Sequence, residues 1–400
     1  MKTKIQLFVA FLLLAVGALW LTSCSSEDAV QSGGSQADAS LTLTINTGKV
    51  GSRATAWTTD PAGSNKTQTE NKINRLTVGI FSSDGSTVKT IVELTPGQTG
   101  GNTLSADGTT AKIVTTSLAA NDQVLVAVNA PTGKFAGVAN ATAFKAVKED
   151  AKDALTDGSS EATEIATNVP MFGENTLSGT GSDFTANVSV QHQLAKITLD
   201  DLEVAFDANG PYKEAEFTPT EFFLVNVPEK LAFNSDAWVN GASHLHGMSS
   251  TTYPSLTAAT EWGTYKEYLS SAATGSTALK GTSDTYASKS YFYVTPCDDA
   301  STNGKMKLII AGDFDANGSG TTEKVFYPVA INATYDAAGN ATAADGGTVF
   351  QVSPNKNYKC TVVIKTKGTT DPTKNLDPQT ATVTVTVTDF VEAKQTTTFE

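Results

Sequence analysis

The chain has 400 residues, of which 40% are hydrophobic, and this is enough to bury the cores of two domains. Its formal net charge of −13 disfavours nucleic acid or an anionic membrane surface as the main binding partner. Only two of the 28 basic residues are arginine, which excludes the arginine clusters that many phosphate-binding proteins use.

The first 23 residues have the features of an export signal. Lys2 and Lys4 precede an apolar run over residues 7–21, which is too short for a comfortable transmembrane helix. The sequence L-T-S-C at 21–24 then resembles a lipobox, in which cleavage before Cys24 leaves a lipid-modified N-terminus. The alternative is an ordinary secretory signal with an incidental cysteine. We expect Cys24 to carry lipid that anchors the precursor in the outer membrane.

Two segments near opposite ends of the chain alternate strictly between apolar and polar residues. Residues 41–46 read L-T-L-T-I-N, and residues 381–390 read A-T-V-T-V-T-V-T-D-F. A period of two residues predicts a half-buried β-strand. The apolar faces consist of Leu41, Leu43 and Ile45 in the first segment and Val383, Val385 and Val387 in the second. Both segments could therefore fit one groove, the first as a temporary plug and the second as its replacement from a neighbouring molecule.

Further β-strands are predicted by short apolar or alternating runs bounded by turn residues. These runs are residues 73–81, 113–114, 123–129, 187–206, 221–227, 290–295, 305–311, 324–331, 349–352 and 358–365. The best helix candidate is 142–155, where Phe144, Val147 and Leu155 share one face, and a short helix is predicted at 262–269. This order of elements predicts an all-β chain of two β-sandwich domains in tandem with minor helices.

Polar and Gly/Ser/Thr-rich stretches mark the expected domain boundaries. They divide the chain into a signal peptide (1–23), a lipidated pro-segment with the plug strand (24–53), an N-terminal β-sandwich (54–186), a C-terminal β-sandwich (187–378) and a donor strand (379–400). Pro372 and Pro378 indicate a linker before the donor strand. The last strand could therefore leave without unravelling the rest of the second domain.

No constellation of residues predicts catalysis, a cofactor or a metal site. Nucleophile motifs, a P-loop and a dinucleotide fingerprint are absent, and the three histidines lack metal-ligand spacing. Residues 313–318 begin like a calcium loop, but Lys324 occupies the position of the last carboxylate, so a hairpin turn is expected. Cys297 and Cys360 could form a disulfide bond, while Cys360 could equally be a buried thiol.

Seven short segments in order along the chain carry a family resemblance. They are I-N-R-L-T-V-G-I-F at 73–81, V-L-V-A-V-N-A at 124–130, V-P-M-F-G at 169–173, L-A-K-I at 194–197, V-F-Y-P-V at 325–329, N-K-N-Y at 355–358 and V-T-V-T-V-T-D-F at 383–390. With the lipobox, they make the chain similar to the fimbrillins of type V pili in Bacteroides-type bacteria, the FimA/Mfa-like family. Phe390 stands where this family often has Trp.

The resemblance implies a transthyretin-like β-sandwich in each domain, export as a lipoprotein, and removal of an N-terminal strand by an arginine-specific protease. Arg53 is the expected cleavage site because it lies in a Gly/Ser loop after the 41–46 strand, and Ala54 would become the first residue. Arg75 enters a predicted strand, where a protease would be blocked. The opened groove would accept the last strand of the next subunit, including Phe390, and head-to-tail insertion would build a filament.

The expected function is that of a structural shaft subunit of a cell-surface fimbrium that serves adhesion, not that of an enzyme. Its partners would be further copies of itself, tip and anchor subunits, the processing protease, and host or bacterial surface receptors, with no nucleic acid. Having both a plug and a donor strand favours the shaft over a tip or anchor subunit, which remains an alternative. The other alternative is a monomeric surface lipoprotein that binds glycans or host ligands and whose last strand completes its own sheet.

Overall fold

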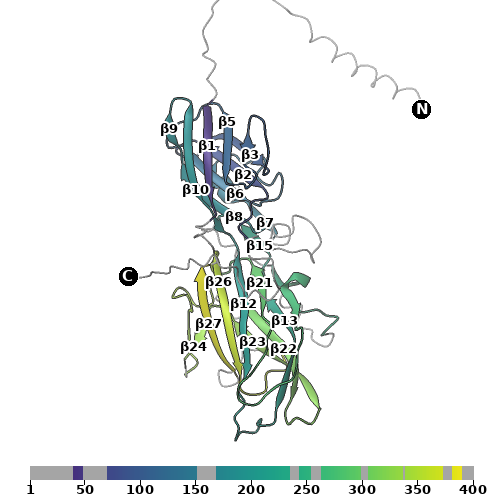
Figure 1. Cartoon of the computed structure of the whole chain (residues 1–400). Helices are drawn as coiled ribbons and strands as arrows, with labels where there is room; N and C mark the ends of the chain where they lie inside the picture. Colours follow the sequence, from purple (N-terminus) through teal and green to yellow (C-terminus); the bar gives the residue numbers. More distant parts are fainter. Residues whose placement is uncertain are drawn as a thin grey trace, which may run out of the picture. The chain divides into compact units, whose positions relative to one another are not determined.

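The fold is known from a computed structural model, and the residues it describes are 39–47, 70–150, 168–234, 243–253, 263–298, 305–336, 338–372 and 381–389. Within these ranges, four five-stranded sheets and three smaller ones account for the architecture (Figure 1). The predicted all-β fold class is confirmed. None of the helices in these ranges is long and apolar enough to cross a membrane.

Two of the five-stranded sheets enclose the first core. One sheet has the order β4 (Thr103–Leu104), β5 (Thr110–Thr115), β1 (Ala39–Asn46), β10 (Asp183–Ser189) and β9 (Ser178–Thr180). The other has the order β11 (Gln191–His192), β8 (Met171–Thr176), β6 (Gln123–Val128), β2 (Leu76–Phe81) and β3 (Val88–Leu94). Alternate residues of both sheets, such as Leu41, Val78 and Val126, are fully buried between them. We call this pair of sheets the first sandwich.

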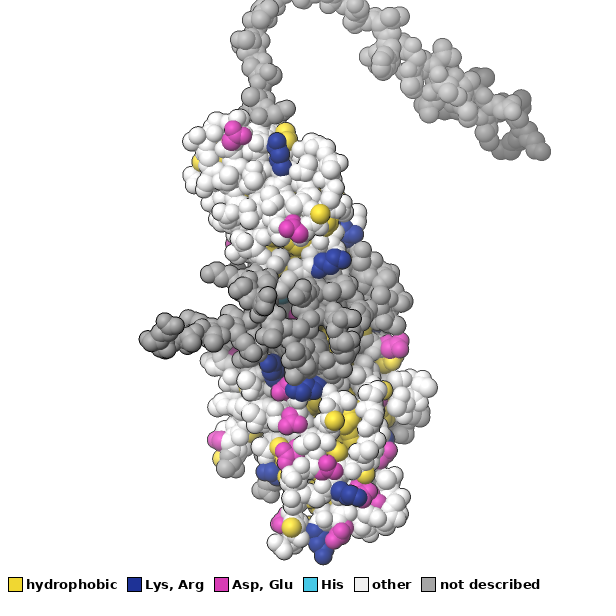
Figure 2. All heavy atoms as spheres, viewed as in Figure 1, with side chains coloured by type: hydrophobic (Ala, Val, Ile, Leu, Met, Phe, Trp, Pro, Cys, Tyr) yellow, Lys and Arg dark blue, Asp and Glu magenta, His cyan; other side chains and the backbone are white. Residues whose placement is uncertain are grey.

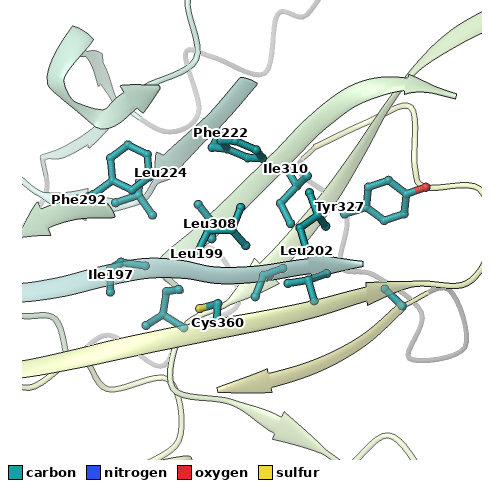
Figure 3. Close-up of a cluster of buried hydrophobic side chains, with 14 of the residues drawn as sticks. Ile197, Leu199, Leu202, Phe222, Leu224, Phe292, Leu308, Ile310, Tyr327 and Cys360 are labelled. Carbon is teal, nitrogen blue, oxygen red and sulfur yellow. The ribbon is translucent and has the colours of Figure 1, made fainter. Parts of the chain in front are cut away.

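The other two five-stranded sheets enclose the largest core, and we call them the second sandwich. One has the order β20 (Asp284–Thr285), β12 (Ala195–Val204), β26 (Lys356–Ile364) and β27 (Ala381–Asp389), with β21 (Ser290–Val294) also paired to β12. Its partner has the order β18 (Ser270–Ala272), β13 (Glu216–Val225), β22 (Lys307–Asp315) and β23 (Thr322–Ala330), with β19 (Leu279–Lys280) paired to β13. Figure 3 shows Leu199, Leu308 and Cys360 within the core between these sheets.

Three small sheets use residues from the long connections. They are β14 (Val227–Pro228) with β16 (His244–His246) and β17 (Thr264–Tyr265), β7 (Lys148–Asp150) with β15 (Lys230–Ala232), and β24 (Thr334–Tyr335) with β25 (Ala341–Thr342). The β7–β15 pairing joins a segment that follows β6 to one that follows β13. The two sandwiches are therefore linked by backbone hydrogen bonds as well as by the chain itself.

The helix predicted at 142–155 is much shorter than expected. Asn140 caps α1 (Ala141–Lys145) by accepting a hydrogen bond from the Ala143 N–H at 2.7 Å. The ring of Phe144 stacks on Phe135 with centroids 4.1 Å apart, which fixes the helix against the first sandwich. Pairing of β7 with β15 then replaces further helical turns, while residues 151–155 lie outside the described ranges. Tertiary pairing has overridden the local periodicity.

Two other local predictions also differ from the structure. The short helix predicted at 262–269 is a 3-10 helix, η3 (Glu267–Leu269), that comes directly after β17. No strand forms at 349–352, where Val352 makes only an isolated bridge to Cys297. Phe350 has a φ of 67°, in the left-handed region, and this interrupts the extended backbone that a strand requires.

Candidate functional site

Strand β1, the predicted plug, lies in the interior of its sheet. It pairs in parallel with β10 from Ser40 to Asn46 and antiparallel with β5 from Ala39 to Thr44 (Figure 1). Both edges of β1 therefore carry a hydrogen-bonded ladder. If β1 were absent, the facing edges of β5 and β10 would be left unpaired with a strand-wide gap between them.

The apolar face of β1 fills the space between the two sheets of the first sandwich. Leu41 and Leu43 have no exposed surface and Ile45 is 2% exposed, while Thr42 points to solvent. Leu43 is bordered in register by Ala111 on one side and Ala186 on the other. Because both neighbours are small, the Leu43 side chain occupies volume that neither of these alanines can fill. The predicted inward face of the plug strand is thus the buried face in the structure.

Strand β27, the predicted donor, lies at an edge of its own sheet. It pairs antiparallel with β26 over its whole length, with Val383 opposite Val362 and Val385 opposite Cys360. Val385 is 5% exposed and Val383 is half-buried, whereas Thr384 is exposed. This arrangement is the one expected for a last strand that completes its own sheet, but it leaves the second edge of β27 without a strand partner in the described sheet.

The plug and donor strands have the same pattern of residue sizes. In β1, Ala39 is followed at every second position by Leu41, Leu43 and Ile45; in β27, Ala381 is followed in the same way by Val383, Val385 and Val387. At alternate positions, the sequence of each strand thus has one small residue followed by three branched aliphatic residues. If the two strands run in the same direction, the same series of sites can accept either of them.

Several predicted site residues lie outside the described ranges. These are the lipidation site Cys24, the processing site Arg53 with Ala54, and the last donor residue Phe390. The domain boundaries at 23, 53 and 379 also fall there. The roles of these residues remain predictions from the sequence.

Cys297 and Cys360, both within the described residues, are buried and are not joined by a disulfide bond. Burial raises the pKa of the Cys360 thiol to about 12, so this group stays protonated at neutral pH. Cys360 lies among aliphatic side chains of the second core (Figure 3). Of the two alternatives drawn from the sequence, the structure has Cys360 as a buried thiol.

The calcium-like segment forms the turn between β22 and β23. The Asp315 carboxylate accepts hydrogen bonds from the backbone N–H groups of Asn317 at 3.1 Å and Gly320 at 2.5 Å. Desolvation alone would raise the pKa of Asp315, but these backbone donors outweigh it and lower the pKa. Asp313 pairs with Lys324 at 2.9 Å. Among the described residues, no group of three or more His, Cys, Asp or Glu side chains is placed to hold a metal ion.

A buried polar cluster, to which the sequence patterns assigned no role, connects the residues before β2 with the second sandwich. Glu70 accepts hydrogen bonds from Lys196 Nζ at 3.1 Å and from the Tyr293 hydroxyl. His192 lies with Nε2 3.1 Å from the Glu70 carbonyl oxygen and Nδ1 3.2 Å from Asn355 Oδ1. Desolvation lowers the pKa of His192 even though the Glu70 carboxylate opposes the shift. The signal in the sequence is Lys196, a lysine within the apolar run L-A-K-I at 194–197.

The strands that border β1 were also only partly recognised. The sequence pattern predicts β5 only at residues 113–114, and it does not separate the end of β10 from the longer 187–206 segment. The signal for β10 is the alternation of Phe184, Ala186 and Val188, which are all buried.

On the face seen in Figure 2, the charged side chains of the described residues are scattered and of both signs. The candidate site is therefore a set of backbone edges and apolar positions rather than a charged pocket.

Comparison with known proteins agrees with this geometry. Residues 39–200, from the start of β1 into β12, match the family model of the major fimbrial subunit protein FimA. The predicted resemblance to the fimbrillin family is confirmed. The matched segment includes β1, β5 and β10, so the fimbrillin resemblance covers the whole candidate groove. A comparison with curated proteins gives no significant match.

Solved structures with the same fold cover nearly the full chain. A fimbrilin (fimA) from Porphyromonas gingivalis W83 matches with a TM-score of 0.58 at 19% identity, over 89% of this chain and 99% of that chain. A candidate cell adhesion protein from Bacteroides eggerthii DSM 20697 matches with a TM-score of 0.58 at 22% identity, over 88% and 96% of the two chains. One from Parabacteroides distasonis ATCC 8503 matches with a TM-score of 0.59 at 14% identity, over 89% and 98%. At these sequence identities, the matches show that the chains share a fold.

Proposed function

We propose that this protein is the shaft subunit of a cell-surface pilus that serves adhesion. In this proposal the chain is exported as a lipoprotein through Cys24, activated by an arginine-specific protease that cuts after Arg53, and polymerised by strand exchange. The observation that carries the proposal is the position of β1, an interior strand that belongs to the fimbrillin-like segment and precedes the expected cleavage site. Because β1 is the first strand of the described chain, a single cut after it could separate it from the rest of the sandwich.

Removal of β1 would create a strong acceptor site. Leu41, Leu43 and Ile45 would vacate their positions, and burying each such side chain is worth about 1.5–3 kcal/mol, or roughly 5–9 kcal/mol together. The N–H and C=O groups of β5 and β10 would lose their partners, and each one that stays buried and unpaired costs about 1–3 kcal/mol. A strand from another subunit would recover both contributions.

The size difference between the two strands explains why a protease would be needed. Val383, Val385 and Val387 are each one methylene smaller than the β1 residues they would replace, a deficit of about 2.4 kcal/mol at ~0.8 kcal/mol per methylene. The plug also belongs to the same chain, so its effective concentration is high. Both contributions favour an intact plug over a donor strand. Once the chain is cut, the released plug is diluted and the donor can bind.

The position of β27 in its own sheet is compatible with two functions. One is the alternative of a monomeric surface lipoprotein, in which the last strand completes the second sandwich. The position is also compatible with exchange, because β27 is paired on one edge only and its departure leaves β12 and β26 paired with each other. In the groove of another subunit the same strand would be paired on both edges, so exchange gains hydrogen bonds and apolar burial.

Two substitutions at the expected cleavage site test the proposal. Arg53→Lys keeps the positive charge but removes the arginine, and Arg53→Ala removes both. We expect wild-type protein to form a ladder of oligomers on a gel run without boiling, while both variants remain monomeric, uncleaved and tethered by lipid. Normal ladders from both variants would contradict activation at Arg53. Absence of ladders from all three proteins would favour the monomeric surface lipoprotein.

A further inference from the structure

The chain contains two arginines, and the second one is held firmly by the fold. Arg75 directly precedes β2 and is half-buried. Its N–H donates to Asn129 Oδ1 at 3.3 Å, and its carbonyl oxygen accepts from the Asn129 N–H at 2.9 Å. Its guanidinium donates from Nη1 to the carbonyl oxygen of Ala130 at 2.8 Å. Both the backbone and the side chain of Arg75 are therefore engaged.

Asn129 is the residue that organises this contact. It is fully buried, directly follows β6, and has a φ of 59°, in the left-handed region. Its Oδ1 also accepts from the Asn74 N–H at 2.8 Å, and its Nδ2 donates to the carbonyl oxygens of Lys72 at 2.8 Å and Val169 at 2.9 Å. One amide side chain thus binds the backbone of Lys72, Asn74 and Arg75. These bonds hold the segment against the end of β6.

The same segment has a second anchor upstream. The Glu70 carboxylate is buried with Lys196, which is 1% exposed, and the Glu70 carbonyl oxygen lies 3.1 Å from His192 Nε2. Downstream, Leu76 begins β2 and pairs with both Val128 and Leu94. The peptide bond after Arg75 is therefore fixed on both sides.

An endopeptidase must bind several residues in an extended form and place the arginine side chain in its own pocket. In a folded protein this requires local opening, and the cleavage rate follows the population of the opened state. Opening at Arg75 breaks the bonds to Asn129 and Ala130 and disturbs an interior strand. Each buried bond that must be broken lowers this population.

We propose that Asn129 restricts arginine-specific processing of this chain to Arg53 by holding Arg75 in a closed position. The inference rests on the proposed function, in which an arginine-specific protease activates the subunit. A cut after Arg75 would remove the residues that lead into β2 together with the Glu70 anchor. Asn129 is accordingly a specificity-determining residue that acts on the substrate chain rather than on the protease.

Asn129→Gly tests this role because glycine adopts a positive φ without strain, so only the side-chain bonds are lost. The matched control is Asn226→Gly. Asn226 is also buried, has a φ of 59°, and follows β13, where its Nδ2 donates to the Lys305 carbonyl oxygen at 2.9 Å. Both variants lose a strand-end asparagine, but only one of these asparagines contacts Arg75.

The experiment treats purified full-length precursor with an arginine-specific endopeptidase and follows the products by mass and N-terminal sequencing. Wild-type and Asn226→Gly proteins should give one new N-terminus, at Ala54, whereas Asn129→Gly should also give one at Leu76, with cleavage there at least ~10-fold faster than in wild type. If Asn129→Gly does not fold, Glu70→Gln should give the same second product more slowly. Wild-type cleavage after Arg75 as fast as after Arg53, or equal resistance in all variants, would overturn the inference. Protection of Arg75 that Asn129→Gly relieves, without any cleavage after Arg53, would support this inference and contradict the proposed function.

Discussion

Replacement of Leu43 by alanine should destabilise the precursor and leave the processed subunit unchanged. Leu43 has no exposed surface and lies between Ala111 and Ala186 on neighbouring strands. Buried Leu→Ala changes cost about 2–5 kcal/mol, and the larger costs occur where the surroundings cannot close the cavity. Because both neighbours are alanines, we expect a loss of about 3–5 kcal/mol in the free energy of unfolding.

The control is Thr42→Ala, one residue away on the exposed face of the same strand. Substitutions of exposed residues usually change stability by less than about 0.5 kcal/mol. Denaturant unfolding of the purified precursors, followed by circular dichroism, measures both variants. After cleavage at Arg53 and release of the plug, both variants become the same polypeptide. Their unfolding curves should then coincide with that of processed wild type.

Two results would refute this reasoning. If Leu43→Ala costs no more than Thr42→Ala, β1 does not fill the first core. If the difference between the variants persists in processed material, β1 remains in place after cleavage and no groove opens. The first result concerns the packing of β1, and the second concerns its removal.

Further outcomes follow from the donor strand, the β22–β23 turn and the buried histidine. Truncation after Gln379 should leave a folded, processed protein that forms no ladder on an unboiled gel, and a truncated protein that fails to fold would contradict exchange. Val385→Asp should also prevent polymerisation because it would bury an unpaired carboxylate. Its control, Thr384→Asp, lies on the exposed face and should polymerise nearly normally. Chelators should not change the melting temperature, because backbone N–H groups satisfy the Asp315 carboxylate; a calcium-dependent rise of several degrees would count against this. Stability measured by denaturant unfolding should decline as the pH falls below about 6.5. Burial lowers the pKa of His192 in the folded protein, so the unfolded chain takes up the proton first. The His192→Gln variant should lack this part of the pH dependence.

Both proposed exchange strands could be recognised from the sequence because strict alternation over six or more residues has one favourable backbone conformation. The inward faces of β1 and β27 follow from the same pattern, as Leu43 and Val385 illustrate. Alternation does not determine the partner. The parallel pairing of β1 with β10, which is distant in the sequence, depends on the topology of the whole sandwich. A strand like β27 is equally suited to an edge of its own sheet and to the groove of a neighbour.

The wrong local predictions have physical causes that the sequence pattern does not contain. The helical spacing of Phe144 and Val147 is real, but backbone pairing of β7 with a distant strand ends the helix at Lys145. Phe350 has a strand-forming side chain and nevertheless adopts a left-handed backbone conformation. Asn129 was part of a recognised segment, but its role depends on four backbone groups that only the fold brings together. Side-chain to backbone bonds of this kind have no periodic signature.

The central claim is that the plug strand is removed before subunits join. The most direct measurement is the N-terminal sequence and intact mass of the protein in filaments sheared from the cell surface. We expect the chain in the filament to begin at Ala54, without lipid and without the residues of β1. Filament protein that begins at a lipidated Cys24 and retains Leu41 and Leu43 would contradict the claim.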